Sequence, residues 1–164
     1  MHNKYKSTTH LLAFQSLFAQ IRHTYSTHQP FYTDGSKDQE KVSAPPSVDT
    51  TRLPNNSSIF SAELYALLIA LQNKSSKFIV FTDSLSSLQS LNSFKITHPL
   101  VLQFLEFYNF LLQKGKTIVF CCIPSHMGVR GNEKVDSIAE TALNSDMSSF
   151  KVPYSDFKPF SKNT

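Results

Sequence analysis

The sequence predicts an α/β fold in which helices flank a β-sheet with parallel strands. First, short apolar runs of strand length alternate along the chain with longer patterns of helical period. Second, strands that alternate with helices favour parallel strands joined by right-handed crossovers. Third, 164 residues, of which 40% are hydrophobic and 17% are charged, suit one domain with a substantial core.

Residues 1–30 are expected to form a helix and a linker that precede the main domain. Over residues 11–25, leucine, phenylalanine and isoleucine recur at helical spacing and give one apolar face. Residues 28–30 break this pattern, and a short strand is predicted over residues 31–33. That strand ends at Asp34.

Residues 37–57 are the least regular part of the predicted domain. They contain three prolines, and many of the other residues are serine, threonine or asparagine. This composition predicts a loop or a badly formed hairpin. Ser61 then fits the cap of a helix over residues 62–73, which is apolar on most sides and is therefore expected to be buried.

The rest of the domain, which is expected to span residues 31–144, repeats the alternation. Each further strand is a compact apolar run, and Gly115 is well placed to stop one of the helices. The expected strands are 77–81 and 117–123, and the expected helices are 85–91, 99–113 and 131–143. Residues 145–164 contain serine and proline and are predicted to form a loosely packed tail.

Net charge, cysteine content and hydrophobic patterning limit the possible functions only broadly. A net charge of +4 suits an anionic partner such as nucleic acid, although many proteins without one share it. Cys121 and Cys122 are adjacent on a predicted strand and point to opposite faces, so we expect two small core residues, not a disulfide or a metal site. No apolar run approaches the roughly 20 residues that span a bilayer, and no signal-peptide pattern is present. We therefore expect no membrane partner and an intracellular compartment, the cytoplasm or the nucleus.

Four acidic residues stand where a sheet of this kind would bring them together. Asp34 and Asp83 each follow the carboxyl end of a predicted strand, where such sheets bind their ligands. Glu63 opens the predicted buried helix, and Asp136 lies in the first turns of the last helix. Taken singly, each has another interpretation: a turn residue, a helix cap, or a charge that favours the positive end of a helix.

Clustering of these carboxylates would imply bound cations. Two like charges about 4 Å apart repel by roughly 4 kcal/mol at an effective dielectric constant near 20. Four such groups would cancel a large part of a domain's stability, typically about 5–15 kcal/mol, unless cations neutralise them. Oxygen ligands favour Mg²⁺, with Mn²⁺ as a substitute, over zinc. Two such ions can hold a phosphodiester, activate water and stabilise the leaving oxygen.

His126 is the other candidate for a chemical role. It lies in the predicted loop before the last helix, and Gly128 and Gly131 would let that loop move. Imidazoles titrate near neutral pH, so this side chain could shuttle protons or help release product beside Asp136. The alternative is an exposed loop histidine without such a role.

Five short motifs, in order, resemble those of type-I ribonuclease H, specifically the version carried by non-LTR retrotransposons. They are FYTDGS at residues 31–36, SAEL at 61–64, FTDSL at 81–85, IPSHMG at 123–128 and GNEKVD at 131–136. The resemblance implies a ribonuclease H-like mixed five-stranded sheet whose hairpin, over residues 37–57, is shortened or degenerate.

The resemblance also implies an enzyme, an endonuclease that hydrolyses the RNA strand of RNA–DNA hybrids with two magnesium ions. His126 would assist catalysis, and Asn132 would brace the final loop and helix. The metal ligands and central catalytic residues would be Asp34, Glu63, Asp83 and Asp136. The substrate contacts, to phosphate or to the RNA 2′-hydroxyl, would be Gly35, Ser36, Ser58 and Ser84.

Two features depart from that family's pattern. Val135 stands where alanine is usual, and residues 37–57 are shorter and more proline-broken than the expected hairpin, which would loosen Asp34. Residues 152–159 resemble sequence that continues beyond this domain in retrotransposon polyproteins, so the chain resembles a piece of one, or a decayed copy. Three alternatives therefore stay open: a nucleic-acid-binding remnant that cuts poorly or not at all, a nuclease acting on DNA, and a scaffold protein with coincidental acids.

Overall fold

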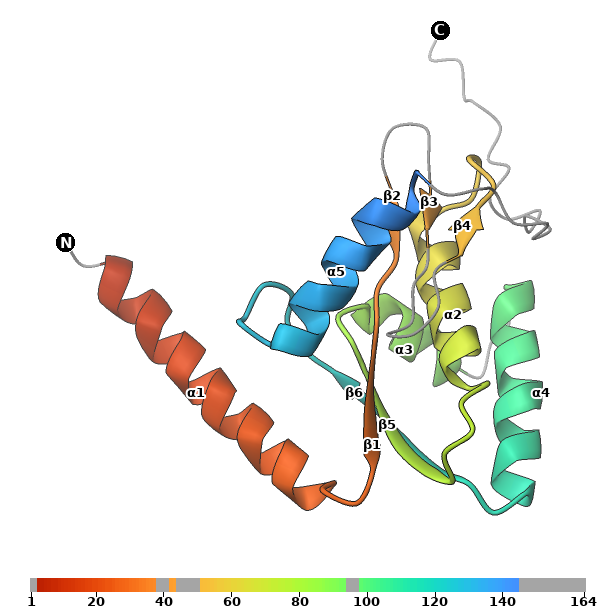
Figure 1. Cartoon of the computed structure of the whole chain (residues 1–164), viewed down its shortest axis with the longest axis horizontal. Helices are drawn as coiled ribbons and strands as arrows, with labels where there is room; N and C mark the ends of the chain where they lie inside the picture. The colour runs from red at the N-terminus through yellow and green to blue at the C-terminus, as the bar shows by residue number, and fades with distance from the viewer. Residues whose placement is uncertain (1–2, 38–41, 44–50, 94–97, 145–164) are drawn as a thin grey trace, which may run out of the picture.

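The computed structural model describes residues 3–37, 42–43, 51–93 and 98–144. Its main sheet has three parallel strands in the order β1-β5-β6. These strands are β1 (Gln29–Thr33), β5 (Lys77–Thr82) and β6 (Thr117–Cys122). Helices lie on both sides of the sheet (Figure 1). The predicted α/β class, a sheet with parallel strands flanked by helices, is confirmed.

The side chains of β5 alternate between two cores, one on each face of the sheet. Phe78 and Val80 face a core shared with three helices, whereas Ile79 and Phe81 face the opposite side. The helices on the first face are α2 (Ile59–Ala70), α3 (Leu85–Leu91) and α4 (Pro99–Gln113). The helices on the second face are α1 (Asn3–Thr24) and α5 (Arg130–Ala142). Because β5 is central and covered on both faces, its four middle residues, 78–81, are all apolar and buried.

Helix α2 begins at Ile59, earlier than the expected residue 62. Its cap is Ser58, whose Oγ accepts a hydrogen bond from the Ser61 N–H at 3.0 Å, so the prediction of Ser61 as the cap was wrong. Both serines suit a cap by residue type, but only Ser58 has the extended backbone that precedes a first turn. Ser61 is buried instead, and its hydroxyl lies 3.2 Å from Nε2 of His98, the cap of α4. Side chains thus connect the starts of the two helices.

Helices α3 and α4 have the predicted bounds. Helix α4 ends as expected because Gly115 adopts a left-handed backbone, with φ at 78°. The Gly115 N–H donates to the Leu112 carbonyl and the Lys116 N–H to the Leu111 carbonyl, the two bonds of a Schellman motif. Glycine suits this position because it has no Cβ to clash at positive φ.

A second, antiparallel sheet follows β1 along the chain. Its strands, in the order β2-β3-β4, are β2 (Ser36–Lys37), β3 (Val42–Ser43) and β4 (Arg52–Leu53). The described residues therefore form two three-stranded sheets in place of the single five-stranded sheet that we expected. The reason is local: β1 ends at Thr33, and two residues outside any ladder, Asp34 and Gly35, separate it from β2.

The irregular segment still contributes to the core. Leu53 of β4 is fully buried and packs against Ala62 and Ala66 of α2. The expected badly formed hairpin is thus present as two-residue strands held on α2, within the part of residues 37–57 that the structure describes. The predicted loosening of Asp34 by this segment stays a prediction.

Helix α1 is longer than the predicted helix over residues 11–25, and it packs on the main sheet. Phe14 and Phe18 are partly buried and pack against the core that contains Ile79 and Phe81, and the ring centroids of Phe18 and Phe81 are 5.2 Å apart. The helix expected to precede the domain therefore covers one face of its sheet. The tail predicted over residues 145–164 lies outside the described residues.

Strand β6 is an edge strand of the main sheet, and this position explains why its two cysteines are not both buried. Cys121 is half-buried and Cys122 is exposed, and both are free thiols. The prediction of two core residues was therefore wrong for Cys122, because a strand with one neighbour is covered less than a central strand. Within the described residues, no helix has the length and apolar character needed to cross a bilayer.

Candidate active site

Three carboxylates meet at the carboxyl ends of two neighbouring strands. Thr33 of β1 pairs with Thr82 of β5, so the residues that follow them, Asp34 and Asp83, leave the sheet side by side. Asp136 comes from α5, which packs against β1. Carboxylate oxygens of the three aspartates all lie within 4.8 Å of one another. The fold thus brings together three of the four residues predicted as ligands.

Glu63 supplies a fourth carboxylate from the second turn of α2. Its exposed fraction is 8%, and its Oε2 atom is buried without a hydrogen-bond partner among the described residues. Glu63 lies outside the group of three, but the charges of Asp34 and Asp83 act on it. An unsatisfied buried oxygen costs about 1–3 kcal/mol, so this carboxylate is the kind of group that a bound cation would satisfy.

Gly35 fixes the close approach of the first strand to α2. A Cβ at this position would lie 2.8 Å from the backbone nitrogen of Glu63, closer than real Cβ atoms come to their neighbours. The backbone N–H of Gly35 acts on the carboxylates of Asp34 and Glu63 and lowers their pKa values, which favours their ionised forms. Glycine here therefore sets the spacing of two site carboxylates.

Burial and mutual repulsion raise the pKa values of the cluster. The pKa of Glu63 rises to about 9, first because the carboxyl group is buried and then because of the charges of Asp34 and Asp83. The pKa of Asp34 rises to about 7, again through burial first and then through Asp83 and Asp136. Burial also raises the pKa of Asp136, and the charge of Asp83 adds to this effect. Without a cation, the cluster therefore holds protons near neutral pH.

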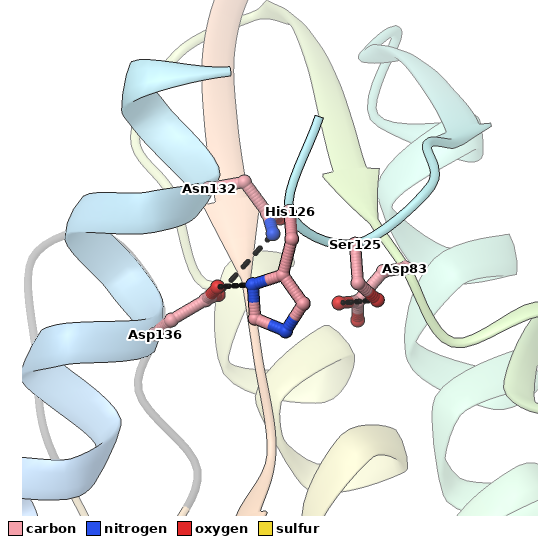
Figure 2. A network of polar contacts seen from close by, with 5 residues as sticks. All are labelled: Asp83, Ser125, His126, Asn132 and Asp136. Atoms are coloured by element: carbon pink, nitrogen blue, oxygen red, sulfur yellow. Dashed lines mark hydrogen bonds and ion pairs between the residues drawn. The ribbon is translucent and has the colours of Figure 1, made fainter. Parts of the chain in front are cut away.

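The loop between β6 and α5 reaches the cluster with two consecutive residues (Figure 2). The Ser125 Oγ donates a hydrogen bond to Asp83 Oδ2 at 2.7 Å. The His126 Nδ1 lies 3.9 Å from Asp136 Oδ2, and the His126 side chain is 85% exposed. His126 has a left-handed backbone, with φ at 56°, as does Gly128 at 73°. The predicted position of His126 beside Asp136 is therefore found, with a looser contact than that of Ser125.

Asn132 supports Asp136 from within α5. Its side chain is 2% exposed, and its Nδ2 donates to Asp136 Oδ1 at 3.2 Å. Residues four apart on a helix lie on one face, so this bond orients the aspartate without the help of another element. This contact lies within α5, so the expected role of Asn132 in bracing the final loop against the helix stays a prediction. Val135, where the family pattern has alanine, is buried in the same helix.

For the residues predicted to contact substrate, the structure shows only contacts within the protein. Ser58 is the cap of α2, and its hydroxyl also donates to that of Ser61 at 3.1 Å. Ser84 follows Asp83, and its hydroxyl lies 2.8 Å from that of Ser87. The side chain of Ser36 is not described, and the backbone N–H of Gly35 acts on the carboxylate of Asp34. Contact of these residues with substrate stays a prediction.

Sequence reasoning missed the contact of Ser125 with Asp83 and assigned the wrong role to Gly131. Gly131 was expected to give the loop freedom, but it lies in the first turn of α5, where a Cβ would overlap the ring of Tyr32. A glycine inside the predicted start of a helix was a signal for close packing, because glycine otherwise weakens a helix. Nothing in the sequence signalled the partner of Ser125.

The chain also matches a known family. The family model described as RNase H matches residues 27–144, which contain the four carboxylates, the loop with His126 and all the strands of the described residues. No curated protein matches the chain detectably. The family match and the aspartate cluster at the strand ends agree, and the chain belongs to the RNase H family, whose members are nucleases that act on nucleic acid.

Proposed function

We propose that the chain hydrolyses the RNA strand of RNA–DNA hybrids, using divalent cations held by its carboxylate cluster. The observation that carries this proposal is the convergence of Asp34, Asp83 and Asp136 within 4.8 Å, in a chain that matches the RNase H family. The ligands would be these three aspartates and Glu63. The motif resemblance described above further supports a retrotransposon-type enzyme that forms part of a larger polyprotein and acts inside the cell.

The residues present fit a hard divalent cation such as Mg²⁺. The donor set consists of carboxylate oxygens, which suit magnesium or manganese better than zinc. Among the described residues, Oε2 of Glu63 is buried without a hydrogen-bond partner, and the raised pKa values of Glu63 and Asp34 indicate that these residues supply too little positive charge to the cluster. When bound, two such ions would supply an activated water and charge stabilisation at the leaving oxygen.

The chain's own residues have separate tasks in this proposal. Ser125 and Asn132 orient two of the carboxylates, and Gly35 keeps Asp34 and Glu63 close together. His126 is exposed and only loosely paired, so its imidazole can turn between Asp136 and solvent and carry protons there. Gly35, Ser36, Ser58 and Ser84 remain candidates for contacts with phosphate or the RNA 2′-hydroxyl.

A cleavage assay with matched duplexes tests the proposed function. End-labelled RNA–DNA hybrid, double-stranded RNA and double-stranded DNA of one sequence are incubated with the chain and Mg²⁺. We expect cleavage of the RNA strand in the hybrid and nowhere else. Cleavage of the DNA duplex would instead identify a DNA nuclease. Binding of the hybrid without cleavage would favour a remnant, the alternative suggested by the two-residue strands β2, β3 and β4.

His126→Ala is expected to slow cleavage by about 10- to 100-fold without abolishing it. General acid–base groups contribute roughly 10²–10⁴-fold, and an exposed side chain 3.9 Å from its partner should lie at or below the lower end. Single-turnover rates across pH 5–9 measure the loss and show whether the pH profile changes shape. Complete loss of cleavage would instead give His126 a central role.

The unfolding midpoint of the metal-free protein should fall as pH rises from about 5 to about 9. The folded-state pKa values of Asp34 and Glu63, about 7 and about 9, lie above those of unfolded carboxyls. Their contribution to stability is therefore complete below pH 4 and is lost as pH rises through the folded values. We expect a fall of about 5 °C or more in EDTA, and a smaller fall in saturating Mg²⁺. A midpoint that rises over this range in EDTA would contradict the assigned direction.

A further inference from the structure

The contact between Ser125 and Asp83 is the shortest of the three contacts in Figure 2. It joins the loop after β6 to the end of β5 at 2.7 Å, whereas the Asn132 and His126 contacts with Asp136 measure 3.2 and 3.9 Å. The left-handed backbone at His126 lets two consecutive residues reach two different carboxylates. Asp83 therefore has a hydrogen-bond donor in the loop, Ser125, and Asp136 has one in the helix that follows the loop, Asn132.

The Ser125 contact contributes little to the fold itself. Ser125 is exposed, so its hydroxyl would find water if Asp83 were absent. The backbone before Asp83 is already held by the pairing of β5 with β1 and β6. The freedom that remains belongs to the Asp83 side chain, whose carboxylate can rotate. A hydrogen bond donated to a charged oxygen is short and directional, and it restricts that rotation.

A neutral donor is well suited to orienting a cation ligand. Lysine or arginine at the position of Ser125 would neutralise Asp83 and compete with a metal ion for it. A hydroxyl instead occupies one of about four lone-pair sites of the carboxylate and leaves the negative charge in place. The remaining lone pairs stay free to face Asp34 and Asp136, with which Asp83 shares the 4.8 Å group.

We propose that Ser125 is a positioning residue that fixes the Asp83 carboxylate for divalent-cation binding. The proposal rests on the proposed function, in which Asp83 is a metal ligand. Loss of the hydroxyl should leave the fold unchanged and let the Asp83 carboxylate rotate among orientations, only some of which face the cluster. The cost should therefore fall on metal affinity more than on the rate at saturating metal.

Metal titrations of three variants test this role. Ser125→Ala removes the hydroxyl, and Ser125→Thr restores a hydroxyl at an exposed position with room for a methyl group. Ser90→Ala is the matched control, because the Ser90 hydroxyl also donates at 2.7 Å, but to the backbone carbonyl of Ser87 in α3. Each variant of the 164-residue chain is titrated with Mg²⁺, and the half-saturating concentration is read both from the unfolding midpoint and from hybrid cleavage.

We expect Ser125→Ala to raise the half-saturating Mg²⁺ concentration by about 3- to 10-fold and to keep the cleavage rate at saturating Mg²⁺ within about 3-fold. Ser125→Thr should restore the wild-type value, and Ser90→Ala should not change it. An unchanged half-saturation in Ser125→Ala, no rescue by threonine, or an equal shift in Ser90→Ala would overturn the proposal. A midpoint in EDTA that falls for Ser125→Ala and not for Ser125→Thr would show a structural role instead.

The two readouts separate this proposal from the proposed function. If the wild-type chain binds Mg²⁺ but does not cut hybrid, hybrid cleavage fails as its function, and the unfolding titration still decides the role of Ser125. If Mg²⁺ does not shift the unfolding midpoint of the wild-type chain, the carboxylate cluster binds no Mg²⁺. Ser125 then cannot position Asp83 for a cation, and the positioning proposal fails as well.

Discussion

Asp34→Asn is expected to abolish hybrid cleavage, with a loss of about 10³-fold or more, while the protein stays folded. Asparagine has nearly the same shape as aspartate, but its neutral amide offers one weak oxygen ligand where the carboxylate offers two charged ones. Asp34 lies within 4.8 Å of Asp83 and Asp136, so its charge is central to the cluster. Removing that charge should leave too little negative potential to hold the cations.

The same substitution should stabilise the metal-free protein. Burial and the charges of Asp83 and Asp136 raise the pKa of Asp34 to about 7, so above pH 7 the folded protein carries an ionised carboxylate that its surroundings destabilise. The unfolding midpoint in EDTA at pH 8 should therefore rise for Asp34→Asn, and its fall between pH 5 and 9 should become shallower. Circular dichroism and thermal unfolding measure both effects beside the cleavage assay.

Glu106→Gln provides the matched control for the carboxyl-to-amide change. Glu106 is an exposed residue of α4, outside the group of three aspartates. It should leave cleavage and the unfolding midpoint close to wild type. If Asp34→Asn cuts at a normal rate, Asp34 is not a cation ligand. If it instead lowers the midpoint in EDTA, the aspartate stabilises the turn after β1 and has a structural role.

The sequence predicted most of the elements because local signals decide them. The bounds of α3 and α4 follow from helical periodicity and from Gly115, whose Schellman bonds involve only neighbouring residues. Local signals were ambiguous at the start of α2, where Ser58 and Ser61 both suited a cap. Their roles are separated by tertiary structure, because Ser61 is buried against His98, 37 residues away.

The site was predictable to the extent that topology determines it. Parallel strands place Asp34 and Asp83 side by side whatever the details of packing. The contact of Ser125 with Asp83 could not be predicted, because it depends on a left-handed backbone at His126, a conformation that residue type alone does not specify. The interruption of the first strand at Gly35 likewise depends on its approach to α2, which is a tertiary contact.

Gly131→Ala is expected to have the largest destabilising effect, a loss of about 1–3 kcal/mol. A Cβ at Gly131 would lie less than 3.0 Å from atoms of the Tyr32 ring, a distance that Cβ atoms in real structures essentially never show. Tyr32 cannot turn away freely, because its ring stacks on that of Phe81 with centroids 5.1 Å apart. Alanine gains at most about 1 kcal/mol in helix propensity, whereas overpacking costs about 1–3 kcal/mol and sometimes more. The steric cost should therefore outweigh the gain.

Cleavage should also fall in Gly131→Ala, because α5 must move away from β1 and it carries Asp136. Urea unfolding gives the free energy of unfolding, and a fall of about 2–4 °C in midpoint is expected per kcal/mol lost. Gly115→Ala is the matched control: its Cβ would meet nothing within 4 Å, so only the positive φ of 78° resists it. That strain costs about 1–2 kcal/mol.

A double-mutant cycle with Tyr32→Leu identifies the cause of the Gly131→Ala effect. If the alanine clashes with the tyrosine ring, the two substitutions should be non-additive, and the double variant should be more stable than the sum of the single losses by at least about 1 kcal/mol. Additive losses would show that Gly131→Ala acts on the backbone of α5 alone. In that case the close packing of Gly131 on Tyr32 would not be what holds Asp136 over the ends of β1 and β5.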